Sequence, residues 1–399
     1  MKLTIIAGAR PNFMKIAPII HAIERRKAEG GRRKGKASKI SYRLVHTGQH
    51  YDRNMSDSFF EELNIPEPDV NLNCNGGTQA EQTAAIMVAF EKELMANPAD
   101  LVMVVGDVTS TMACAIVAKK LNTKVAHVEA GIRSFDLTMP EEINRMVTDC
   151  LTDYFFTTSE FANKNLKAAG VPEESIFFVG NVMIDTLMAN RSRFRKPDLC
   201  DKLQLSEKNY LVLTLHRPAN VDDDQKLKKL LNAIIDASRG LPVIFPVHPR
   251  TAKIIAGLNL SNISKSPSLP LSPSLVLRSL GEGGSPLQSV QNLHLIEPLG
   301  YLEFNYLVEH SKAVITDSGG ITEETTVMGI PCITLRNTTE RPETISIGTN
   351  ELIGTDPASI KSVLDRLFAS NWKRGGIPEL WDGKTGERII KILSEQANE

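Results

Sequence analysis

Cysteine is scarce in this chain of 399 residues, and long apolar runs are missing. The five cysteines are scattered and form no Cys-x-x-Cys pair, which indicates reduced thiols of a cytoplasmic protein rather than a disulfide framework. No apolar run approaches the roughly 18 residues of a membrane helix. The first residues, MKLTIIAGARPNFMK, also lack a signal-peptide pattern, because their apolar segment is too short. We therefore expect no membrane association and a cytoplasmic location.

An excess of basic charge is also absent, because 46 lysines and arginines face 47 aspartates and glutamates. A dedicated nucleic-acid-binding protein would carry a basic excess, so we expect no nucleic-acid partner. The balance still permits a local basic pocket for a phosphorylated small molecule. At about 150 residues per domain, the length suggests two or three domains that need no disulfide or metal to fold.

Several catalytic signatures are missing as well. The chain has no Gly-x-Gly-x-x-Gly, the fingerprint of dinucleotide binding, which disfavours an NAD-dependent enzyme, and we expect no cofactor. It also has no His-Glu-x-x-His, no Cys/His cluster and no Gly-x-Ser-x-Gly elbow, which disfavours zinc proteases and serine hydrolases. The acidic run Asp222-Asp223-Asp224 precedes a helical segment, where acidic residues are ordinary, so we expect no metal site.

Short apolar runs rich in Val and Ile recur along the chain, with helix-like segments between them. Such near-continuous runs are typical of strands buried on both faces, and strands that alternate with helices build parallel sheets. The runs are LTIIA (3–7), YRLVH (42–46), LVMVV (101–105), KVAHV (124–128), YFFTT (154–158), YLVLTL (210–215), PVIFPV (242–247), LHLI (293–296), AVITD (313–317) and PCITL (331–335). The helix-like segments are 14–27, 78–95, 110–121, 225–239 and 321–328.

The strand pattern restarts near residue 210, after a helical stretch around 183–205. We therefore predict an α/β fold with two Rossmann-like domains facing across a cleft, the first at 1–179 and the second at 180–383. The amphipathic segment 384–399 is expected to form a helix that packs back on the first domain. The stretches 30–39 and 261–290 are expected to be loops because of their composition.

Polar side chains directly follow seven of the apolar runs. In a doubly wound sheet, ligands bind beyond the carboxyl ends of the strands, so these positions are the ones to inspect. They are Arg10, the segment His46-Thr47-Gly48-Gln49-His50, Gly106-Asp107, Glu129-Ala130-Gly131, His216-Arg217, His248 and Asp317-Ser318-Gly319-Gly320. A capping or turn role would explain any one of them. Seven together indicate one ligand-binding cleft between the two domains.

Two loops have the composition of phosphate-binding turns. Gly8-Ala9-Arg10-Pro11 leads from a strand into a helix, and Lys15 follows about one turn later, so backbone N–H groups and two cations could meet an anion there. Ser318-Gly319-Gly320 opens another helix, and its glycines would let a diphosphate approach the backbone. Glu324, one turn into that helix, could accept hydrogen bonds from ribose hydroxyls, although an acidic residue also simply favours a helix start.

The candidates for acid and base chemistry are Asp107, Glu129, Glu141 and His216. Carboxylates in a dry cleft beside phosphate can act as acid or base, with pKa values set by burial and by neighbouring charges. Pro140-Glu141-Glu142-x-Asn144-Arg145 also has the composition of a helix start, so spacing alone leaves the role of Glu141 open.

The ordered set of these fragments resembles the non-hydrolysing UDP-N-acetylglucosamine 2-epimerases, a family with the two-domain glycosyltransferase-B architecture. The resemblance covers nearly the whole chain, and each fragment is weak alone while the set is highly specific. The matching fragments are Gly8-Ala9-Arg10-Pro11 with Lys15, His46-Thr47-Gly48-Gln49-His50, Gly106-Asp107, His127-Val128-Glu129-Ala130-Gly131-Ile132-Arg133, Pro140-Glu141-Glu142-x-Asn144-Arg145, Thr214-Leu215-His216-Arg217, Pro246-Val247-His248-Pro249, Asp317-Ser318-Gly319-Gly320-Ile321 with Glu323-Glu324, and Thr339-Glu340-Arg341-Pro342-Glu343.

The resemblance implies reversible conversion of UDP-GlcNAc to UDP-ManNAc by a cofactor-free homodimer. It assigns catalysis to the positions of Asp107, Glu129, Glu141 and His216. It assigns contacts with the UDP-sugar to Arg10, Lys15, His248, Phe304, Ser318, Gly319, Gly320, Glu324 and Arg341, with Phe304 near uracil. The chain departs from many relatives at Ala219, where they have a glutamate, and at Tyr51, where many bacterial relatives have an arginine linked to activation by a second UDP-GlcNAc.

Three other functions remain open from the sequence. An epimerase for a related sugar, such as UDP-2,3-diacetamido-2,3-dideoxyglucuronate, would use the same catalytic set, although Thr339-Glu340-Arg341-Pro342-Glu343 resembles the UDP-GlcNAc branch more closely. A glycosyltransferase of the same architecture would need an acceptor and would release UDP irreversibly. A non-catalytic sensor of nucleotide sugars would not need four acid/base candidates at strand ends.

Overall fold

The computed structural model describes residues 1–32, 40–49, 62–247, 251–252, 254–255 and 292–397. Most of the stretches expected as loops, 30–39 and 261–290, and the positions of His50, Tyr51 and His248 lie outside the described residues. The chain divides into two compact units, each with its own parallel sheet. The N-terminal unit comprises Met1–Ser192 and Pro378–Glu399, and the C-terminal unit comprises Arg193–Ile377.

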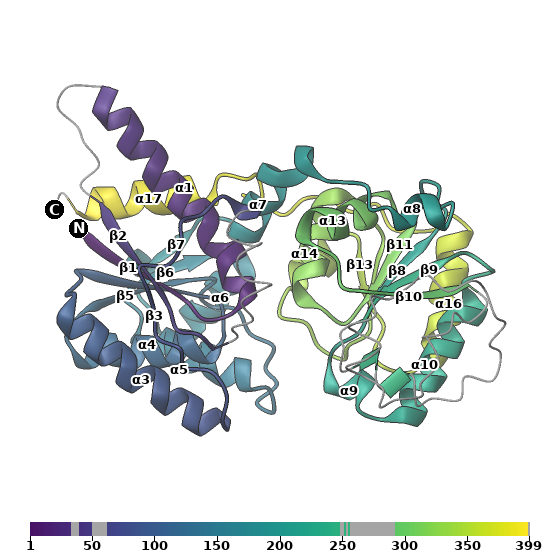
Figure 1. Cartoon of the computed structure of the whole chain (residues 1–399), viewed down its shortest axis with the longest axis horizontal. Coiled ribbons are helices and arrows are strands. Elements are labelled where there is room, and N and C mark those ends of the chain that lie inside the picture. Colours follow the sequence, from purple (N-terminus) through teal and green to yellow (C-terminus); the bar gives the residue numbers. More distant parts are fainter. Residues whose placement is uncertain (33–39, 50–61, 248–250, 253, 256–291, 398–399) are drawn as a thin grey trace. The chain divides into compact units, whose positions relative to one another are not determined.

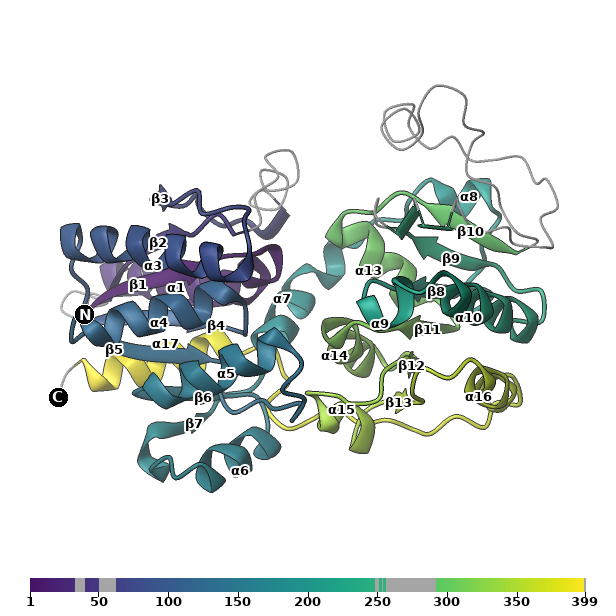
Figure 2. The same ribbon diagram turned by 90° about the horizontal axis from the view of Figure 1, so that it is seen from below.

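The sheet of the N-terminal unit has seven parallel strands in the order β3-β2-β1-β4-β5-β6-β7. The strands are β1 (Lys2–Ala7), β2 (Ser41–His46), β3 (Val70–Asn71), β4 (Leu101–Val105), β5 (Lys124–Val128), β6 (Tyr154–Thr157) and β7 (Ile176–Phe178). Its described helices are α1 (Arg10–Arg32), α3 (Gln79–Ala96), α4 (Thr109–Lys120), α5 (Pro140–Leu151), α6 (Glu160–Ala168), α7 (Val182–Asn190) and α17 (Thr385–Gln396). Figures 1 and 2 show α1 and α17 on one face of this sheet and α3, α4 and α5 on the other.

The sheet of the C-terminal unit has six parallel strands in the order β10-β9-β8-β11-β12-β13. The strands are β8 (Leu211–Thr214), β9 (Val243–Pro246), β10 (Leu293–Ile296), β11 (Ala313–Thr316), β12 (Cys332–Thr334) and β13 (Asn350–Leu352). Its described helices are α8 (Leu199–Lys202), α9 (Pro218–Val221), α10 (Asp224–Ala237), α13 (Tyr301–His310), α14 (Gly319–Met328), α15 (Pro342–Ser346) and α16 (Ala358–Phe368). Numbered from β8, this sheet repeats the order 3-2-1-4-5-6 found in the first six strands of the other unit, so the predicted α/β class with two Rossmann-like sheets is confirmed.

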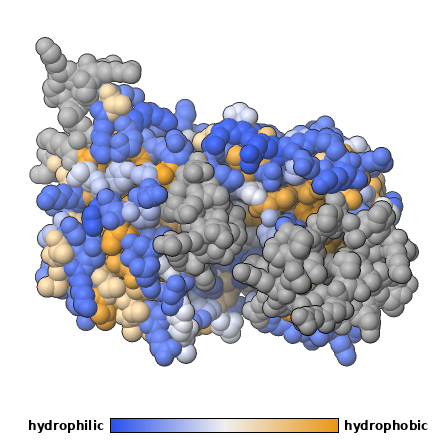
Figure 3. All heavy atoms as spheres, in the orientation of Figure 1, coloured by the Kyte–Doolittle hydropathy of each residue, from blue (hydrophilic) through white to orange (hydrophobic). Residues whose placement is uncertain are grey.

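Burial on both faces explains why these segments are strands. All five residues of β4 are buried, and its Val102 and Val104 pack with Phe90 of α3 in one apolar cluster. In β8, Leu211 and Leu213 belong to a cluster with α10, whereas Val212 belongs to another cluster with α13. Alternate residues of a strand point to opposite faces, so an uninterrupted apolar run supplies both layers of the core. On the face drawn in Figure 3, hydrophilic residues cover most of the described surface.

Three strands escaped the sequence analysis, namely β3, β7 and β13. Each has only two or three residues and lies at the edge of its sheet, so it gives no apolar run long enough to stand out. The acidic run before α10 has a structural role in the described chain: the Asp223 carboxylate caps that helix and accepts hydrogen bonds from the N–H groups of Gln225 and Lys226. No described helix combines the length and the apolar character that crossing a membrane requires.

The boundaries of the units differ from the domain limits of 1–179 and 180–383. Helix α7 belongs to the N-terminal unit because it packs on α1, and Thr186 Oγ1 donates a hydrogen bond of 2.5 Å to the carbonyl of Met14. The chain returns to this unit at Pro378, and α17 then packs on α1. A Cβ atom at Gly386 would lie 2.5 Å from the carbonyl oxygen of Pro18, so the two helices can approach this closely only with glycine there.

Candidate active site

Strand register places the candidate residues of the N-terminal unit at one edge of its sheet. Val105 at the end of β4 pairs with Val128 at the end of β5, so Gly106 and Glu129 emerge from the sheet side by side. Ala7 of β1 likewise pairs with His46 of β2. The structure therefore brings the chain segments after four neighbouring strands together, as parallel strands require.

The turn after β1 is closed by Asn12, which is buried. The N–H groups of Gly8 and Ala9 both donate to Asn12 Oδ1 at 2.9 Å, and Asn12 Nδ2 donates to the carbonyl of Val105 at 3.1 Å. The turn was expected to offer backbone N–H groups to an anion, and those of Gly8 and Ala9 are bonded to the amide of Asn12. The signal for this contact was present in the sequence, because Asn12 stands in GARPN two residues after Arg10, where α1 begins.

Lys15 and Glu129 form an ion pair in which both side chains are largely buried. Lys15 Nζ lies 2.8 Å from Glu129 Oε2, and the two side chains are 12% and 4% exposed. Gly106, where the lysine passes the end of β4, has a φ of 66°, a conformation that favours glycine. Glu129 has a φ of 73°, a conformation that non-glycine residues rarely adopt and that often marks a functional position.

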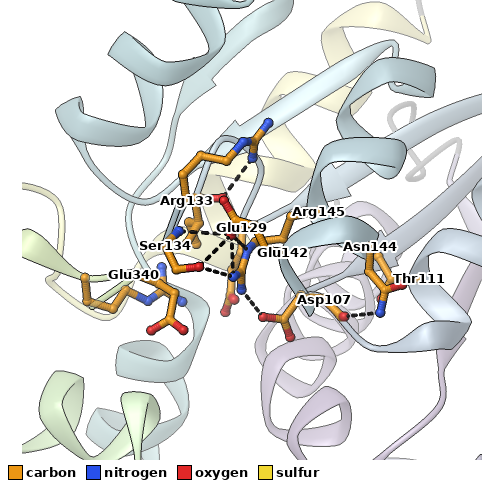
Figure 4. Close-up of polar contacts among 12 residues, drawn as sticks. Asp107, Thr111, Glu129, Arg133, Ser134, Glu142, Asn144, Arg145 and Glu340 are labelled. Carbon is orange, nitrogen blue, oxygen red and sulfur yellow. Dashed lines mark hydrogen bonds and ion pairs between the residues drawn. The ribbon is translucent and has the colours of Figure 1, made fainter. Parts of the chain in front are cut away.

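Asp107 is held by two residues of α5. Asn144 Nδ2 donates to the Asp107 carbonyl at 2.8 Å, and the Arg145 guanidinium forms an ion pair with the Asp107 carboxylate. Figure 4 shows Arg145 lying between Asp107 and Glu142. About a third of the Asp107 side chain is exposed, whereas Arg145 is buried. The Asp107 carboxylate is therefore accessible to a ligand, while Asn144 and Arg145 fix its position from the protein side.

The two adjacent glutamates at the start of α5 have different environments. Glu142 is buried and accepts hydrogen bonds from the N–H groups of Ser134 and Phe135 and from Arg145. Burial opposes its ionisation, but the bonds from Ser134 and Arg145 hold the pKa of the Glu142 carboxyl below its usual range. Glu141, the residue matched to catalysis by the resemblance, is exposed. Glu142 therefore orients the loop before α5, and a role for Glu141 stays a prediction.

His127 lies in β5 and is completely buried. Its Nδ1 atom is 2.7 Å from Asp149 Oδ1, and its Nε2 atom is 2.9 Å from the carbonyl oxygen of Gly106. Asp149 also forms an ion pair of 2.6 Å with Arg133 and accepts the N–H of Gly131 at 3.1 Å. Burial works against the charge of Asp149, but His127 and Arg133 hold the pKa of this carboxyl below its usual range.

A neutral polar cluster lies beside these charged groups. Ser110 Oγ donates to Gln49 Oε1 at 2.8 Å and lies 2.7 Å from Thr47 Oγ1. His46 is buried, which lowers its pKa to about 4, so its ring is neutral and its Nδ1 atom accepts the N–H of Gly48. These contacts hold the turn after β2 in place.

In the C-terminal unit, Asp317 follows β11 and organises the turn after β8. Its buried carboxylate accepts the N–H groups of His216 and Arg217 and the amide of Asn220, and it lies 2.7 Å from His216 Nδ1. Burial opposes ionisation, but the His216 imidazole and the other donors keep the pKa of Asp317 below its usual range. The His216 side chain is 56% exposed, so Asp317 fixes one ring nitrogen and leaves the other toward solvent.

Helix α14 begins at Gly319, with Ser318 as its N-cap. The Arg336 guanidinium makes two hydrogen bonds of 2.7 Å to Glu340, and both partners lie close to Gly319. Burial disfavours a charged Glu340, but Arg336 and Arg217 lower the pKa of Glu340 to about 2. Buried charges thus flank a helix N-terminus, which is an anion-binding position.

Glu324 is buried in the second turn of α14 and accepts a hydrogen bond of 3.0 Å from the Tyr301 hydroxyl. Burial raises the pKa of Glu324 to about 7. The neighbouring Glu323 pairs with Arg341 at 2.5 Å, so Arg341 is anchored to the same helix. Phe304 of α13 is partly buried and packs against the apolar cluster beneath this helix.

The sequence analysis did not select several residues that these contacts show to be important. They are Asn12, Asp149, Glu142, Arg145, Tyr301 and Arg336. Glu142 and Arg145 stand in a quoted fragment but were given no role of their own. The others lie inside helices or after short strands, where polar residues are common. Among the described residues, no group of three His, Cys, Asp or Glu side chains is arranged to hold a metal ion.

Comparisons with known proteins agree over nearly the whole chain. The model of the UDP-N-acetylglucosamine 2-epimerase family matches residues 33–394. A UDP-N-acetylglucosamine 2-epimerase of Methanocaldococcus jannaschii is 39% identical, with 99% of each chain covered. A UDP-2,3-diacetamido-2,3-dideoxy-D-glucuronate 2-epimerase of Pseudomonas aeruginosa is 36% identical, with 89% of this chain and 88% of that protein covered.

The fold agrees as well. A crystal structure of the M. jannaschii UDP-GlcNAc 2-epimerase in complex with UDP-GlcNAc and UDP is similar to this structure with a TM-score of 0.81. The identity in this comparison is 38%, and it covers 99% of this chain and 100% of the other. Both the sequence and the fold therefore support the resemblance that the motifs suggested. The chain belongs to the UDP-N-acetylglucosamine 2-epimerase family.

Proposed function

We propose that this enzyme interconverts UDP-GlcNAc and UDP-ManNAc by inverting the configuration at C2 of the sugar. The observation that carries the proposal is the similarity of 39% over 99% of the chain to the M. jannaschii UDP-N-acetylglucosamine 2-epimerase. The site geometry supports it, because Asp107 and Glu129 follow the paired ends of β4 and β5, each beside a buried cation.

The chemistry begins with departure of the nucleotide. The C2–H bond of a pyranose has no adjacent carbonyl, so direct removal of its proton is very hard. When the C1–O bond breaks, UDP leaves with the bonding electrons and positive charge develops on the ring. A carboxylate then takes the C2 proton, and the C2–H electron pair forms the C1=C2 bond of a 2-acetamidoglucal. A proton delivered to the other face of C2, with return of UDP to C1, gives the epimer, so no redox cofactor is required.

The candidate residues divide between the two parts of the substrate. Asp107 and Glu129 are assigned to the proton transfers at C2, and Glu141 assists protonation. Lys15 balances the charge of Glu129, and Arg10 and His216 balance the charge of departing diphosphate. His248, Ser318, Gly319, Gly320 and Arg341 are assigned to the UDP-sugar, Phe304 to the uracil, and Glu324 to the ribose. The N-terminus of α14 adds a partial positive charge for the diphosphate.

Proton NMR of the purified enzyme with UDP-GlcNAc in deuterium oxide tests this proposal. We expect signals of UDP-ManNAc to grow to an equilibrium mixture and the C2 proton signals to disappear as deuterium enters. Epimer formed without deuterium at C2 would contradict the elimination mechanism, and no epimer at all would contradict the function.

A second candidate substrate is UDP-2,3-diacetamido-2,3-dideoxyglucuronate, because a relative at 36% identity carries that name. This sugar has an additional carboxylate and an additional acetamido group, and the same elimination would invert its C2. The ratio of kcat/KM for the two substrates decides between them. We expect the ratio to favour UDP-GlcNAc by at least tenfold, about 1.4 kcal/mol.

We also propose a cytoplasmic homodimer. All five cysteines are free thiols in the structure, which suits a reducing compartment.

Val88 and Met95 of α3 and Ile143 and Met146 of α5 are exposed apolar side chains on the layer of helices α3, α4 and α5. Sedimentation equilibrium of the purified chain tests the dimer, and a polar substitution such as Met146→Lys should shift the equilibrium toward monomer.

A further inference from the structure

The ring of His127 lies between two hydrogen-bond acceptors. One is the carboxylate of Asp149 at 2.7 Å from Nδ1, and the other is the carbonyl oxygen of Gly106 at 2.9 Å from Nε2. The ring therefore meets an acceptor at each nitrogen: an N–H at Nε2 donates to the Gly106 carbonyl, and Asp149 lies against Nδ1.

Asp149, on the other side of the ring, is itself held in place. Asp149 is almost completely buried, and its second oxygen is occupied by Arg133 at 2.6 Å and by the N–H of Gly131 at 3.1 Å. The carboxylate therefore links the His127 ring to Arg133. A buried charge is costly unless it is paired and hydrogen-bonded, and each member of this cluster meets that condition.

The same contacts hold Gly106 from both sides. Its N–H donates to the carbonyl of Val128 at 3.0 Å, and its own carbonyl oxygen accepts from His127. The last two residues of β5, His127 and Val128, thus hold the peptide groups on both sides of Gly106, and Glu129 follows Val128 directly in the chain. Because Asp107 is bonded directly to Gly106, His127 controls where the Asp107 backbone starts relative to Glu129.

We propose that His127 is a positioning residue for the reaction at C2: anchored by Asp149, its ring holds the Gly106 carbonyl in place and so sets the spacing of Asp107 and Glu129. This inference rests on the proposed function, because it assigns those two carboxylates to the same reacting carbon. Proton transfer requires near-contact geometry, and a displacement of about 1 Å can cost about 100-fold in rate. Partners behind the reacting groups commonly provide such precision.

Two substitutions separate the two contacts of the ring. The amide nitrogen of His127→Gln can replace Nε2 and still donate to Gly106, whereas His127→Asn can replace Nδ1 and keep only the contact with Asp149. As a matched control, Asp153→Asn weakens the opposite end of the same strand, where Asp153 accepts the N–H of Val125 at 2.7 Å and pairs with Lys119 at 2.9 Å.

The main measurement is the primary kinetic isotope effect on kcat with UDP-GlcNAc deuterated at C2. We expect His127→Asn to lower kcat by about 100-fold and to increase the isotope effect, because proton removal becomes slower than the other steps. His127→Gln should recover at least tenfold of that loss, and Asp153→Asn should leave the isotope effect unchanged. A loss of folded enzyme lowers the rate but not the isotope effect, so this readout separates positioning from stability.

Three results would overturn the proposal. The first is an isotope effect in His127→Asn equal to that of the wild-type enzyme, and the second is a His127→Gln variant no better than His127→Asn. The third comes from long-range ¹H–¹⁵N spectra of the wild-type protein, in which the His127 signals, identified by their absence in His127→Asn, would show no hydrogen on Nε2. A wild-type enzyme that does not epimerise UDP-GlcNAc would instead overturn the proposed function first.

Discussion

At the scale of single residues, the candidate site is built from carboxylates that each lie beside a cationic or ionisable partner. Glu129 pairs with Lys15, Asp107 with Arg145, and Asp317 with His216. Each carboxylate follows the end of a parallel strand. Burial makes an unpaired charge costly, so these partners keep charged groups stable where a reaction needs them.

Replacing Glu129 by Gln tests the more buried of the two carboxylates assigned to proton transfer at C2. The variant lacks a base at this position, so we expect the rate of deuterium entry at C2 to fall by at least about 100-fold. The ion pair between Lys15 and this carboxylate would also be lost, which should lower the free energy of unfolding by about 3 kcal/mol. The measurements are NMR in deuterium oxide and urea denaturation.

The control is Glu160→Gln, which makes the same change at an exposed position in the first turn of α6. It should retain the wild-type rate. UDP binding measured by calorimetry shows that each variant is folded. A Glu129→Gln rate within twofold of wild type would remove Glu129 from the catalytic residues.

At the scale of elements, helix α17 illustrates how the end of the chain completes the N-terminal unit. The N–H of Gly386 donates to Asp185 Oδ2 of α7 at 2.8 Å. The indole of Trp381 donates to the carbonyl of Thr158 at 2.9 Å just before this helix. Both contacts are buried, so the C-terminal segment is part of the core and not an appendage.

Asp185 should make the stability of the protein depend on pH. Burial raises the pKa of Asp185 from 3.8 to about 6, so between these values the native state binds a proton that the unfolded state has released. The contribution of protonated Asp185 to the free energy of unfolding is therefore fully present below pH 4 and is lost as the pH rises toward 6. The total change is about 3 kcal/mol at two pKa units.

Urea denaturation at pH values from 4 to 7 measures this effect. We expect Asp185→Asn to remove most of this decline in the free energy of unfolding, because an amide does not titrate. The amide oxygen can still accept the N–H of Gly386, so the variant should stay folded. Asp236→Asn on the exposed side of α10 is the control and should leave the decline intact. A variant with the same pH dependence as the wild-type protein would disprove the role of Asp185.

At the scale of the whole molecule, two sheets with the same strand order carry different parts of the proposed chemistry. The acid and base candidates Asp107 and Glu129 lie in the N-terminal unit, and the candidates for the nucleotide lie mostly in the C-terminal unit. Each unit also contains one of the two tryptophans, Trp381 in the N-terminal unit and Trp372 in the C-terminal unit. The indoles can therefore report on each unit separately.

UDP should stabilise the C-terminal unit more than the N-terminal unit. We expect UDP at 100 times its Kd to raise the free energy of unfolding reported by Trp372 in a Trp381→Phe variant by about 2.7 kcal/mol. The transition reported by Trp381 in a Trp372→Phe variant should shift less. Both variants are followed by fluorescence in urea with and without UDP. An equal shift in both would show that the nucleotide does not bind mainly through the C-terminal unit.

Sequence order and periodicity were enough to predict the fold class and ten of the strands, and the resemblance of the quoted fragments to a known family pointed to the family. Apolar runs report burial on both faces, and parallel strands bring their carboxyl ends to one edge, so the residues after AVITD or LVMVV could be grouped before any contact was known. The short edge strands could not be found this way, because two or three residues carry no periodicity.

The partners of the site residues needed the folded chain. Lys15 meets Glu129 across 114 positions of sequence, Arg145 meets Asp107 across 38, and Gly386 meets Asp185 across 201. A local sequence pattern cannot predict contacts between residues so far apart in the chain, since these contacts depend on which strands are neighbours and how closely helices approach. For the same reason the sequence could suggest that Gly8 and Ala9 face a phosphate, while only packing showed that Asn12 already takes their N–H groups.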